Sequence, residues 1–254
     1  MLAIDVGNTH ITIGLFKKAD LKAVFRVSTE RCLKGAAFFE YLPEVREHIS
    51  PDAVISSVRT PVTDIIIREF EAKTGKRPLV VDVYTPMGIE VCYETKETLG
   101  VDRLICAAAA YCLYRKEGRA VVTVDMGTAT TIDYVTEDGI FIGGMITPGL
   151  RSSYQGLLAA APQLPNLDDL LAHVVIGNST AECVRSGVTI GHAAMIRGVA
   201  EMMAQAKGTL PIVVLTGGLS GMVRDILPRD YIVDDNLILK GLSIVFNLHS
   251  ENKC

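Results

Sequence analysis

Two short stretches place an aspartate, a glycine and hydroxyl side chains where an apolar strand pattern stops. The first is "DVGNT", beginning at Asp5, and the second is "DMGTATT", beginning at Asp125, 125 − 5 = 120 positions further along a chain of 254 residues. Glycine lets a turn approach an anion and direct its N–H groups at it. An aspartate beside a phosphate needs a divalent cation between them, and Mg²⁺ prefers oxygen ligands.

Each of these turns alone is also what an ordinary hairpin needs, since Asp, Gly and Asn are common turn residues. The repetition in both halves of the chain favours the chemical interpretation. Two such turns facing one another across a cleft would hold a polyphosphate and its cation from both sides. The patterns GxxxxGK[ST] and GxGxxG do not occur in the sequence, so a nucleotide would be bound by a different architecture.

Two further glycine-rich segments are candidates for the same site. "TGGLSG" follows the apolar run "PIVVL", and its Gly217 and Gly218 leave room for a flat ligand such as adenine. "GGMITPG", residues 143–149, would be a loop that lines the cleft. Taken alone, each segment is more typical of a simple turn that needs glycine for its backbone angles.

The segment "LGVDRL", residues 99–104, offers a candidate for acid–base chemistry at the start of an Ala-rich helix. Asp102 could accept a proton from a substrate hydroxyl while Arg103 holds a carboxylate. A kinase uses this pairing, because one carboxylate orients the attacking oxygen. The alternative is a helix-capping aspartate beside a solvated arginine.

The elements that must position these residues repeat in order. Apolar alternation predicts strands at 1–4, 11–16 and 21–27, a helix at 36–48, a strand at 52–58, a helix at 63–74 and a strand at 78–83. A helix over 101–116 is closed by Gly118. The second half predicts strands at 121–124, 131–135 and 139–142, helices at 150–160 and 179–206, a strand at 211–216, a short helix at 221–226, an edge strand at 231–236 and a helix at 239–248. The chain is therefore predicted to hold two βββαβα-like domains, residues 1–117 and 118–254.

The composition excludes several classes of protein. Hydrophobic residues make up 49% and charged residues 21%, as in globular domains, and a net charge of −4 argues against nucleic acid as a partner. No run of 18 apolar residues predicts a membrane span or a signal peptide. The six cysteines form no CxxC pair, which predicts reduced thiols of a cytoplasmic protein and no zinc site.

The ordered motifs resemble those of the type III pantothenate kinases. These motifs are Asp5-x-Gly7-Asn8-Thr9, Gly100-x-Asp102-Arg103 and Asp125-x-Gly127-Thr128-Ala129-Thr130-Thr131-x-Asp133, with "GGMITPG" and "TGG" completing the pattern. The resemblance spans nearly the whole chain. It implies the actin/sugar-kinase/acetate-kinase superfamily: an α/β protein of two duplicated ribonuclease H-like domains with the active site in the cleft between them. It also implies phosphorylation of pantothenate by ATP to 4′-phosphopantothenate, the first step of coenzyme A synthesis.

The same resemblance assigns roles to residues. It implies a first phosphate loop made of Asp5, Val6, Gly7, Asn8, Thr9, His10, Ile11 and Thr12. Asp102 is the implied proton acceptor, and Thr128 contacts ATP. The pantothenate site is implied to contain Tyr93, Gly100, Val101, Asp102, Arg103 and Thr180. Asp125 would bind the monovalent cation, K⁺ or NH₄⁺, and the pantothenate pocket would be completed across a homodimer interface.

Two other classes of function remain open on the sequence. A nucleotide-binding regulatory or accessory protein of the same fold is the first alternative. It would need the two phosphate turns, but it would not need Asp102 in addition to them. Another kinase or a phosphatase of the superfamily is the second alternative. A phosphatase would have to position water, whereas Arg103 beside the candidate base favours an alcohol that bears a carboxylate.

Overall fold

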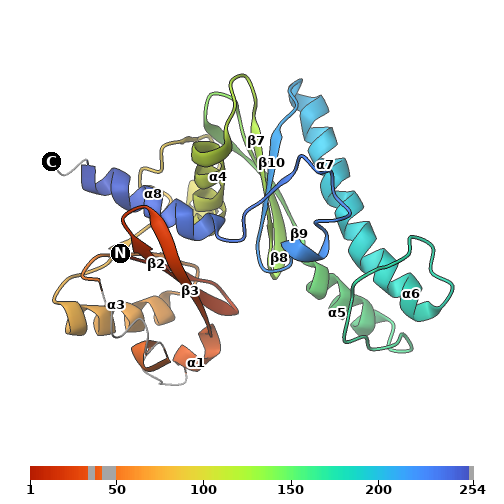
Figure 1. Ribbon diagram of the computed structural model, residues 1–254, viewed down its shortest axis with the longest axis horizontal. Coiled ribbons are helices and arrows are strands. Elements are labelled where there is room, and N and C mark those ends of the chain that lie inside the picture. Colours follow the sequence, from red (N-terminus) through yellow and green to blue (C-terminus); the bar gives the residue numbers. More distant parts are fainter. Residues whose placement is uncertain (34–37, 42–49, 252–254) are drawn as a thin grey trace. The chain divides into compact units, whose positions relative to one another are not determined.

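The computed structural model describes residues 1–33, 38–41 and 50–251 (Figure 1). Most of the helix predicted at 36–48 lies outside the described residues, and the part within them, Phe38–Tyr41, is a 3₁₀ turn. The chain forms two compact units. Unit 1 comprises Met1–Ile89, Tyr93–Ala109 and Leu237–Cys254, and unit 2 comprises Glu90–Cys92 and Ala110–Asn236.

Unit 1 is built on a sheet with the strand order β3-β2-β1-β4-β5. Its strands are β1 (Leu2–Val6), β2 (His10–Lys17), β3 (Asp20–Ser28), β4 (Ala53–Ser57) and β5 (Leu79–Val80). β2 runs antiparallel to both β1 and β3, whereas β4 is parallel to both β1 and β5. Its helices are α1 (Thr29–Leu33), α3 (Thr60–Thr74), the first part of α4 (Val101–Tyr114) and α8 (Leu237–Glu251), with a 3₁₀ turn at Lys96–Thr98.

The core of unit 1 lies between this sheet and α3. Alternate residues of β1 and β2 point to the helix, so Ile4, Ile13 and Ile55 of the strands pack in one cluster with Ile66 and Phe70 of the helix. All five side chains are fully buried. This apolar layer holds β1 and its two neighbouring strands in fixed register, and therefore fixes the turn at the end of β1.

Unit 2 is built on a sheet with the strand order β11-β10-β7-β8-β9-β6. Its strands are β6 (Glu90–Val91), β7 (Val121–Met126), β8 (Ala129–Val135), β9 (Ile140–Pro148), β10 (Ile212–Thr216) and β11 (Ile232–Val233). Its helices are the end of α4, α5 (Leu150–Ala160), α6 (Thr180–Arg185), a π-helical segment at Ser186–Ile190, α7 (Gly191–Lys207) and a 3₁₀ turn at Ser220–Met222. α5 and α7 pack with β7, β8 and β10 in one apolar core (Figure 1).

The two sheets confirm the predicted internal repeat. In unit 1, β1, β2 and β3 form an antiparallel meander, and β1 also pairs with β4 in the parallel direction. In unit 2, β7, β8 and β9 form the same meander, and β7 pairs with β10 in the parallel direction. The orders β3-β2-β1-β4-β5 and β9-β8-β7-β10-β11 are therefore equivalent. The equivalent central strands are β1 and β7, each of which ends in one of the Asp-x-Gly turns. This arrangement is the duplicated α/β fold that the sequence predicts.

The structure differs from the predicted elements at several places. α8 packs with the first sheet, where Gly14 of β2 lies so close that a Cβ would approach Leu239 to 3.1 Å. Unit 1 thus includes residues 237–254, although the sequence predicts that residues 118–254 form the second domain. α4 ends at Tyr114, so Gly118 closes the following turn and not the helix. The short elements α1 and β6 are not predicted from the sequence.

Candidate active site

The first Asp-x-Gly turn joins β1 to β2. Asp5 lies opposite Thr12 in the antiparallel register, and the Gly7 N–H donates to the His10 carbonyl at 3.0 Å. Asn8, Thr9 and His10 are exposed, whereas Val6 and Ile11 below them are buried. The register thus presents the short polar segment at the end of a rigid apolar hairpin, as the sequence predicts.

The turn and its aspartate are held by side chains from outside the hairpin. The buried hydroxyl of Thr29 donates to the Gly7 carbonyl at 2.9 Å, and the Thr29 N–H donates to the Thr9 carbonyl at 3.1 Å. The buried Ser56 hydroxyl on β4 donates to Oδ1 of Asp5 at 2.8 Å. Asp5 is therefore oriented before any ligand arrives, which favours binding because less side-chain freedom is lost.

The second turn repeats this design with one residue fewer. Asp125 lies opposite Thr131, a separation of 131 − 125 = 6 positions, against 12 − 5 = 7 for Asp5 and Thr12. The Gly127 N–H donates to the Ala129 carbonyl at 3.0 Å. Asp125 is half-buried and Thr128 is exposed at the tip.

The "GGMITPG" segment packs directly against this second turn. It forms the end of β9 and leads to Gly149, the residue before α5. The Gly149 N–H and the Ser152 hydroxyl both donate to the Thr128 carbonyl, at 2.9 and 2.7 Å. A Cβ on Gly149 would lie 2.3 Å from the Gly127 carbonyl oxygen, so glycine is needed for this approach. Residues 143–148 are thus the end of β9 and not the loop that the sequence predicts, because they continue the pairing with β8, and Gly149 contacts the turn.

The "TGG" segment lies beside Asp125. Thr216, the last residue of β10, is opposite Asp125 in the parallel register. Gly217 has φ +90°, and a Cβ on it would lie 2.4 Å from Oδ1 of Asp125, so both its backbone angle and its surroundings require glycine. Gly218 is exposed immediately after it. Unit 2 therefore brings Asp125, the Thr128 turn and Gly217 together at one end of its sheet.

Asp102 and Arg103 lie in the first turn of α4. The helix begins at Val101, so Asp102 is a first-turn acid and not the cap, and its Oδ1 accepts the Arg103 N–H at 2.9 Å. A Cβ on Gly100 would lie 2.5 Å from Oδ1 of Asp102, which explains the glycine before the helix. Arg103 is only 8% exposed, so the alternative of a solvated arginine is wrong.

Tyr93 and Thr180 lie on different units. Tyr93 is half-buried in unit 1, and Thr180 is exposed at the first position of α6 in unit 2. Ser179 caps this helix: its hydroxyl accepts the Glu182 N–H at 3.3 Å, and the Glu182 carboxylate accepts the Asn178 N–H at 2.9 Å. Thr180 is thereby held at a well-defined helix start.

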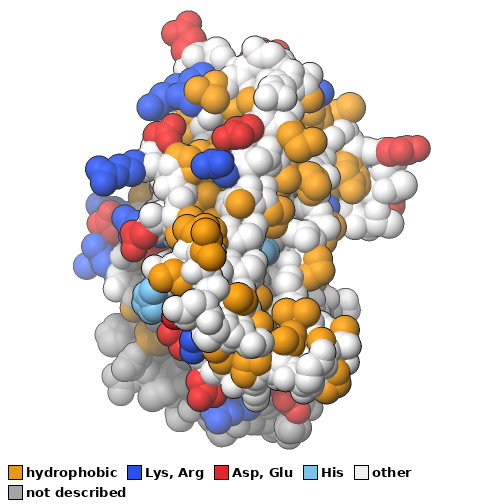
Figure 2. All heavy atoms as spheres, turned by 90° about the vertical axis from the view of Figure 1, so that its right-hand side faces the viewer, with side chains coloured by type: hydrophobic (Ala, Val, Ile, Leu, Met, Phe, Trp, Pro, Cys, Tyr) orange, Lys and Arg blue, Asp and Glu red, His pale blue; other side chains and the backbone are white. Residues whose placement is uncertain are grey.

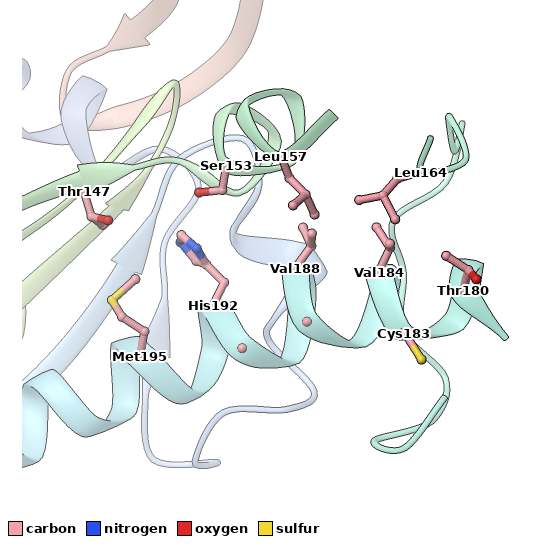
Figure 3. A pocket seen from close by; sticks show the side chains of 12 residues that line it. Thr147, Ser153, Leu157, Leu164, Thr180, Cys183, Val184, Val188, His192 and Met195 are labelled. Carbon is pink, nitrogen blue, oxygen red and sulfur yellow. The ribbon is translucent and has the colours of Figure 1, made fainter. Parts of the chain in front are cut away.

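A groove of about 510 Å³ runs along unit 2 beside Thr180 (Figure 3). One face of α6, the π-helical segment and α7 forms its floor, through Thr180, Val184, Val188, His192 and Met195. Leu157 and Ser153 of α5, Thr147 of β9 and Leu164 complete the wall. This surface is not predicted from the sequence, although the spacing of four, four, four and three residues along the helix is typical of one helical face.

His192 lies at the β9 end of this groove, with Thr147 and Ser153. Its Nε2 lies 2.9 Å from Oγ1 of Thr130, which is fully buried on β8. Burial lowers the pKa of the His192 imidazole below its ordinary value. The sequence singles out Thr130 only as part of the "DMGTATT" motif and does not single out His192.

The described residues hold no group of three or more His, Cys, Asp or Glu side chains that could bind a metal ion by themselves. A cation at Asp5 or Asp125 would therefore take most of its oxygen ligands from phosphate, water or backbone. This donor set suits Mg²⁺, which is commonly bound through one or two carboxylates plus substrate phosphates. Among the described residues, no helix is both long and apolar enough to span a lipid bilayer.

Solved structures of other proteins share this fold. The chain aligns with the ROK hexokinase of Thermus thermophilus at a TM-score of 0.51 and 16% identity, covering 99% of each chain. A Campylobacter jejuni protein described as a Baf family transcriptional activator gives a TM-score of 0.65 at 18% identity, over 99% of this chain and 100% of the other. These similarities show the fold alone, which is that of the sugar kinases and their relatives.

The family is shown by sequence. The model of the type III pantothenate kinase family matches residues 1–202. The type III pantothenate kinase of Moorella thermoacetica is 32% identical, over 97% of this chain and 98% of its own, and that of Syntrophotalea carbinolica is 31% identical over the same shares. The chain belongs to the type III pantothenate kinase family.

Proposed function

We propose that this protein transfers the γ-phosphoryl group of ATP to the 4′-hydroxyl of pantothenate, which gives 4′-phosphopantothenate and ADP and begins coenzyme A synthesis in the cytoplasm. The family membership gives the reaction. The observation that carries the site is the start of α4: Gly100, two residues before Asp102, makes room for its carboxylate, and the buried Arg103 follows it. A carboxylate-bearing alcohol such as pantothenate matches this pair of groups.

In this reaction the hydroxyl oxygen attacks the γ-phosphorus, its proton passes to the Asp102 carboxylate, and the bond to the β-phosphate oxygen breaks. Asp102 orients the hydroxyl, and Arg103 holds the carboxylate of pantothenate. A buried guanidinium is a strong partner for a carboxylate because its planar fork donates two parallel hydrogen bonds. Gly100, Val101 and Tyr93 line the same pocket in this proposal, and Thr180 contacts the substrate as well.

The two Asp-x-Gly turns hold the phosphates of ATP in this account. The first turn, Asp5 to Thr12, and the tip at Thr128 direct backbone N–H groups and hydroxyls at phosphate oxygens. The nucleoside is assigned to the segment beside Asp125, that is, to Gly217, which packs against the Asp125 carboxylate, and to the exposed Gly218 after it. Asp5, which accepts a hydrogen bond from Ser56, would hold Mg²⁺ directly or through water, and the ion would neutralise the charge of the phosphates.

We assign the monovalent cation, K⁺ or NH₄⁺, to Asp125. Its carboxylate lies under Gly217 and beside the turn that carries Thr128, so a cation there would be close to the negative phosphates. A half-buried carboxylate with backbone carbonyls nearby is a suitable oxygen environment for such an ion.

We also propose that two copies of the chain form a homodimer through the face that carries α5, α6 and α7. Figure 2 looks onto that side and shows hydrophobic side chains spread between polar ones. The groove is lined largely by apolar residues, and Val175 and Ile176 beside α6 are 75% and 89% exposed. Large apolar side chains at this exposure are typical of surfaces that a partner covers.

A coupled assay of ADP release tests the proposed function. The purified protein is given ATP and Mg²⁺ with pantothenate, glucose, acetate or no acceptor, each with and without K⁺. We expect ADP release that needs pantothenate and is strongest with K⁺. Release that is independent of pantothenate, or that follows glucose or acetate, would contradict the proposal and favour another enzyme of the fold.

A further inference from the structure

Thr130 and His192 form a polar pair inside an apolar layer. Thr130 shares its face of β8 with Ile132 and Tyr134, since side chains alternate along a strand, and this face packs against α7. The two side chains are 0% and 8% exposed, with Nε2 and Oγ1 2.9 Å apart. Core packing alone does not need this pair, because valine has the shape of threonine and requires no partner.

The pair lies directly beneath the second phosphate turn. Thr130 is opposite Met126, the last residue of β7, so only Gly127, Thr128 and Ala129 separate the two. The turn itself is held at the Thr128 carbonyl, which accepts the Gly149 N–H and the Ser152 hydroxyl of α5. His192 holds the base of the turn from α7, which makes it a second support of the same three residues.

The chemistry of the imidazole fits a support and not a phosphate ligand. Because burial lowers its pKa, His192 is neutral near pH 7 and offers one donor and one acceptor nitrogen. It brings no positive charge toward ATP. Its side chain points from the helix toward Ser153 and Thr147 at the end of the groove (Figure 3).

We propose that His192 is a positioning residue for ATP binding: its hydrogen bond to Thr130 fixes the base of the second phosphate turn and so the orientation of Thr128. The proposal rests on the proposed function, which assigns that turn to ATP. A support at the base of a loop acts on affinity because a loop that is already ordered loses less freedom on binding.

The test compares variants that keep or remove the bond. H192M and T130V remove it, whereas H192Q and T130S keep a polar atom near the same place. Calorimetric titration with ATP and Mg²⁺ gives the Kd for the nucleotide, and steady-state kinetics give the KM for pantothenate. We expect H192M and T130V each to raise the Kd for ATP by about fivefold or more, which corresponds to the loss of roughly one hydrogen bond. The KM for pantothenate should stay within about twofold, and H192Q and T130S should recover most of the affinity for ATP.

The double variant H192M/T130V should bind ATP no more weakly than the worse single variant, because the two changes remove one interaction. I196V removes a methyl group from the buried face of the same helix, and it is the matched packing control that should leave the Kd unchanged. Additive losses, equal losses in the KM for pantothenate, or a loss in I196V as large as in H192M would overturn the proposal.

Thr128→Ala separates failure of this proposal from failure of the proposed function. If Thr128→Ala weakens ATP binding and T130V does not, the turn binds ATP and only the role of His192 is wrong. If neither variant changes the Kd, the assignment of the turn is wrong and the proposal falls with it. Should H192M not fold, T130V and T130S decide the question, since both are close in size to threonine.

Discussion

Two glycines at this site make room for the aspartates beside them. Gly100 lacks the Cβ that would lie 2.5 Å from the Asp102 carboxylate, and Gly217 lacks one that would lie 2.4 Å from Asp125. In each case a glycine makes room for an aspartate that the proposed mechanism uses. The two carboxylates have different roles in the proposal, one as proton acceptor and one as cation ligand.

Asp102→Asn should lower kcat at least about 100-fold, because a positioned base contributes that much to proton transfer and asparagine cannot accept the proton. The fold should persist, since the asparagine carbonyl can still accept the Arg103 N–H. The Kd for ATP should change little. Steady-state kinetics and calorimetry check both, with Asp64→Asn on the exposed side of α3 as the matched control. Near-normal turnover in Asp102→Asn would leave the residue a purely structural role.

Asp125→Asn should abolish the stimulation by K⁺, because the neutral amide attracts a monovalent cation far less than a carboxylate does. The measurement is the rate of phosphorylation against K⁺ concentration at constant ionic strength. Asp138→Asn is the matched control, because it removes the same charge in the exposed turn between β8 and β9, at the other end of β8 from the Thr128 turn. Its rate should depend on K⁺ as that of the unchanged protein does. An unaltered K⁺ response in Asp125→Asn would remove this residue from the cation site.

At the scale of elements, the helix that follows Thr180 joins the groove to the second sheet. It is α-helical at both ends and π-helical at Ser186–Ile190, and side chains of this middle part donate to carbonyls of the preceding loop: Ser186 to Val174 at 2.6 Å and Thr189 to Leu170 at 2.6 Å. The loop is thereby fixed to the helix. His192 begins the next α-helical part and faces Thr130.

The buried His192 should make stability depend on pH. Its pKa is lowered in the folded state by burial, so the unfolded chain binds the proton first. Stability is therefore complete above the unfolded value of about 6.5 and is lost as the pH falls below it. Melting temperatures from pH 7.5 down to 5.5 should fall less steeply in H192Q than in the unchanged protein. H173Q, at an exposed histidine, is the control, and an equal slope in H192Q and the unchanged protein would contradict the account.

The sequence predicts these elements unevenly, for physical reasons. The buried strands and α5 follow directly from periodicity, and α5 has the predicted bounds 150–160. The two-residue β6 is not predictable, because its pairing with β9 is decided by tertiary contacts and not by its own residues. The π-helical segment also escapes prediction, since it keeps the apolar face that an ordinary helix would show.

At the scale of the whole chain, the internal repeat is the strongest inference from sequence. Only the Asp-x-Gly frame matches between the halves, yet both sheets have the same strand order and directions. The packing of α8 with the first sheet could not be predicted, because any apolar helix at the end of the chain is compatible with either half. That the two turns face one another across a cleft stays a prediction of the repeat.

The central claim is that the protein phosphorylates pantothenate on its 4′-hydroxyl. The most direct measurement is phosphorus NMR of a reaction that contains the protein, ATP, Mg²⁺, K⁺ and pantothenate. The account predicts one new phosphomonoester signal, coupled to the CH₂ protons next to the 4′ oxygen, that grows in step with ADP. ADP formed together with inorganic phosphate alone, or no reaction with pantothenate, would contradict it.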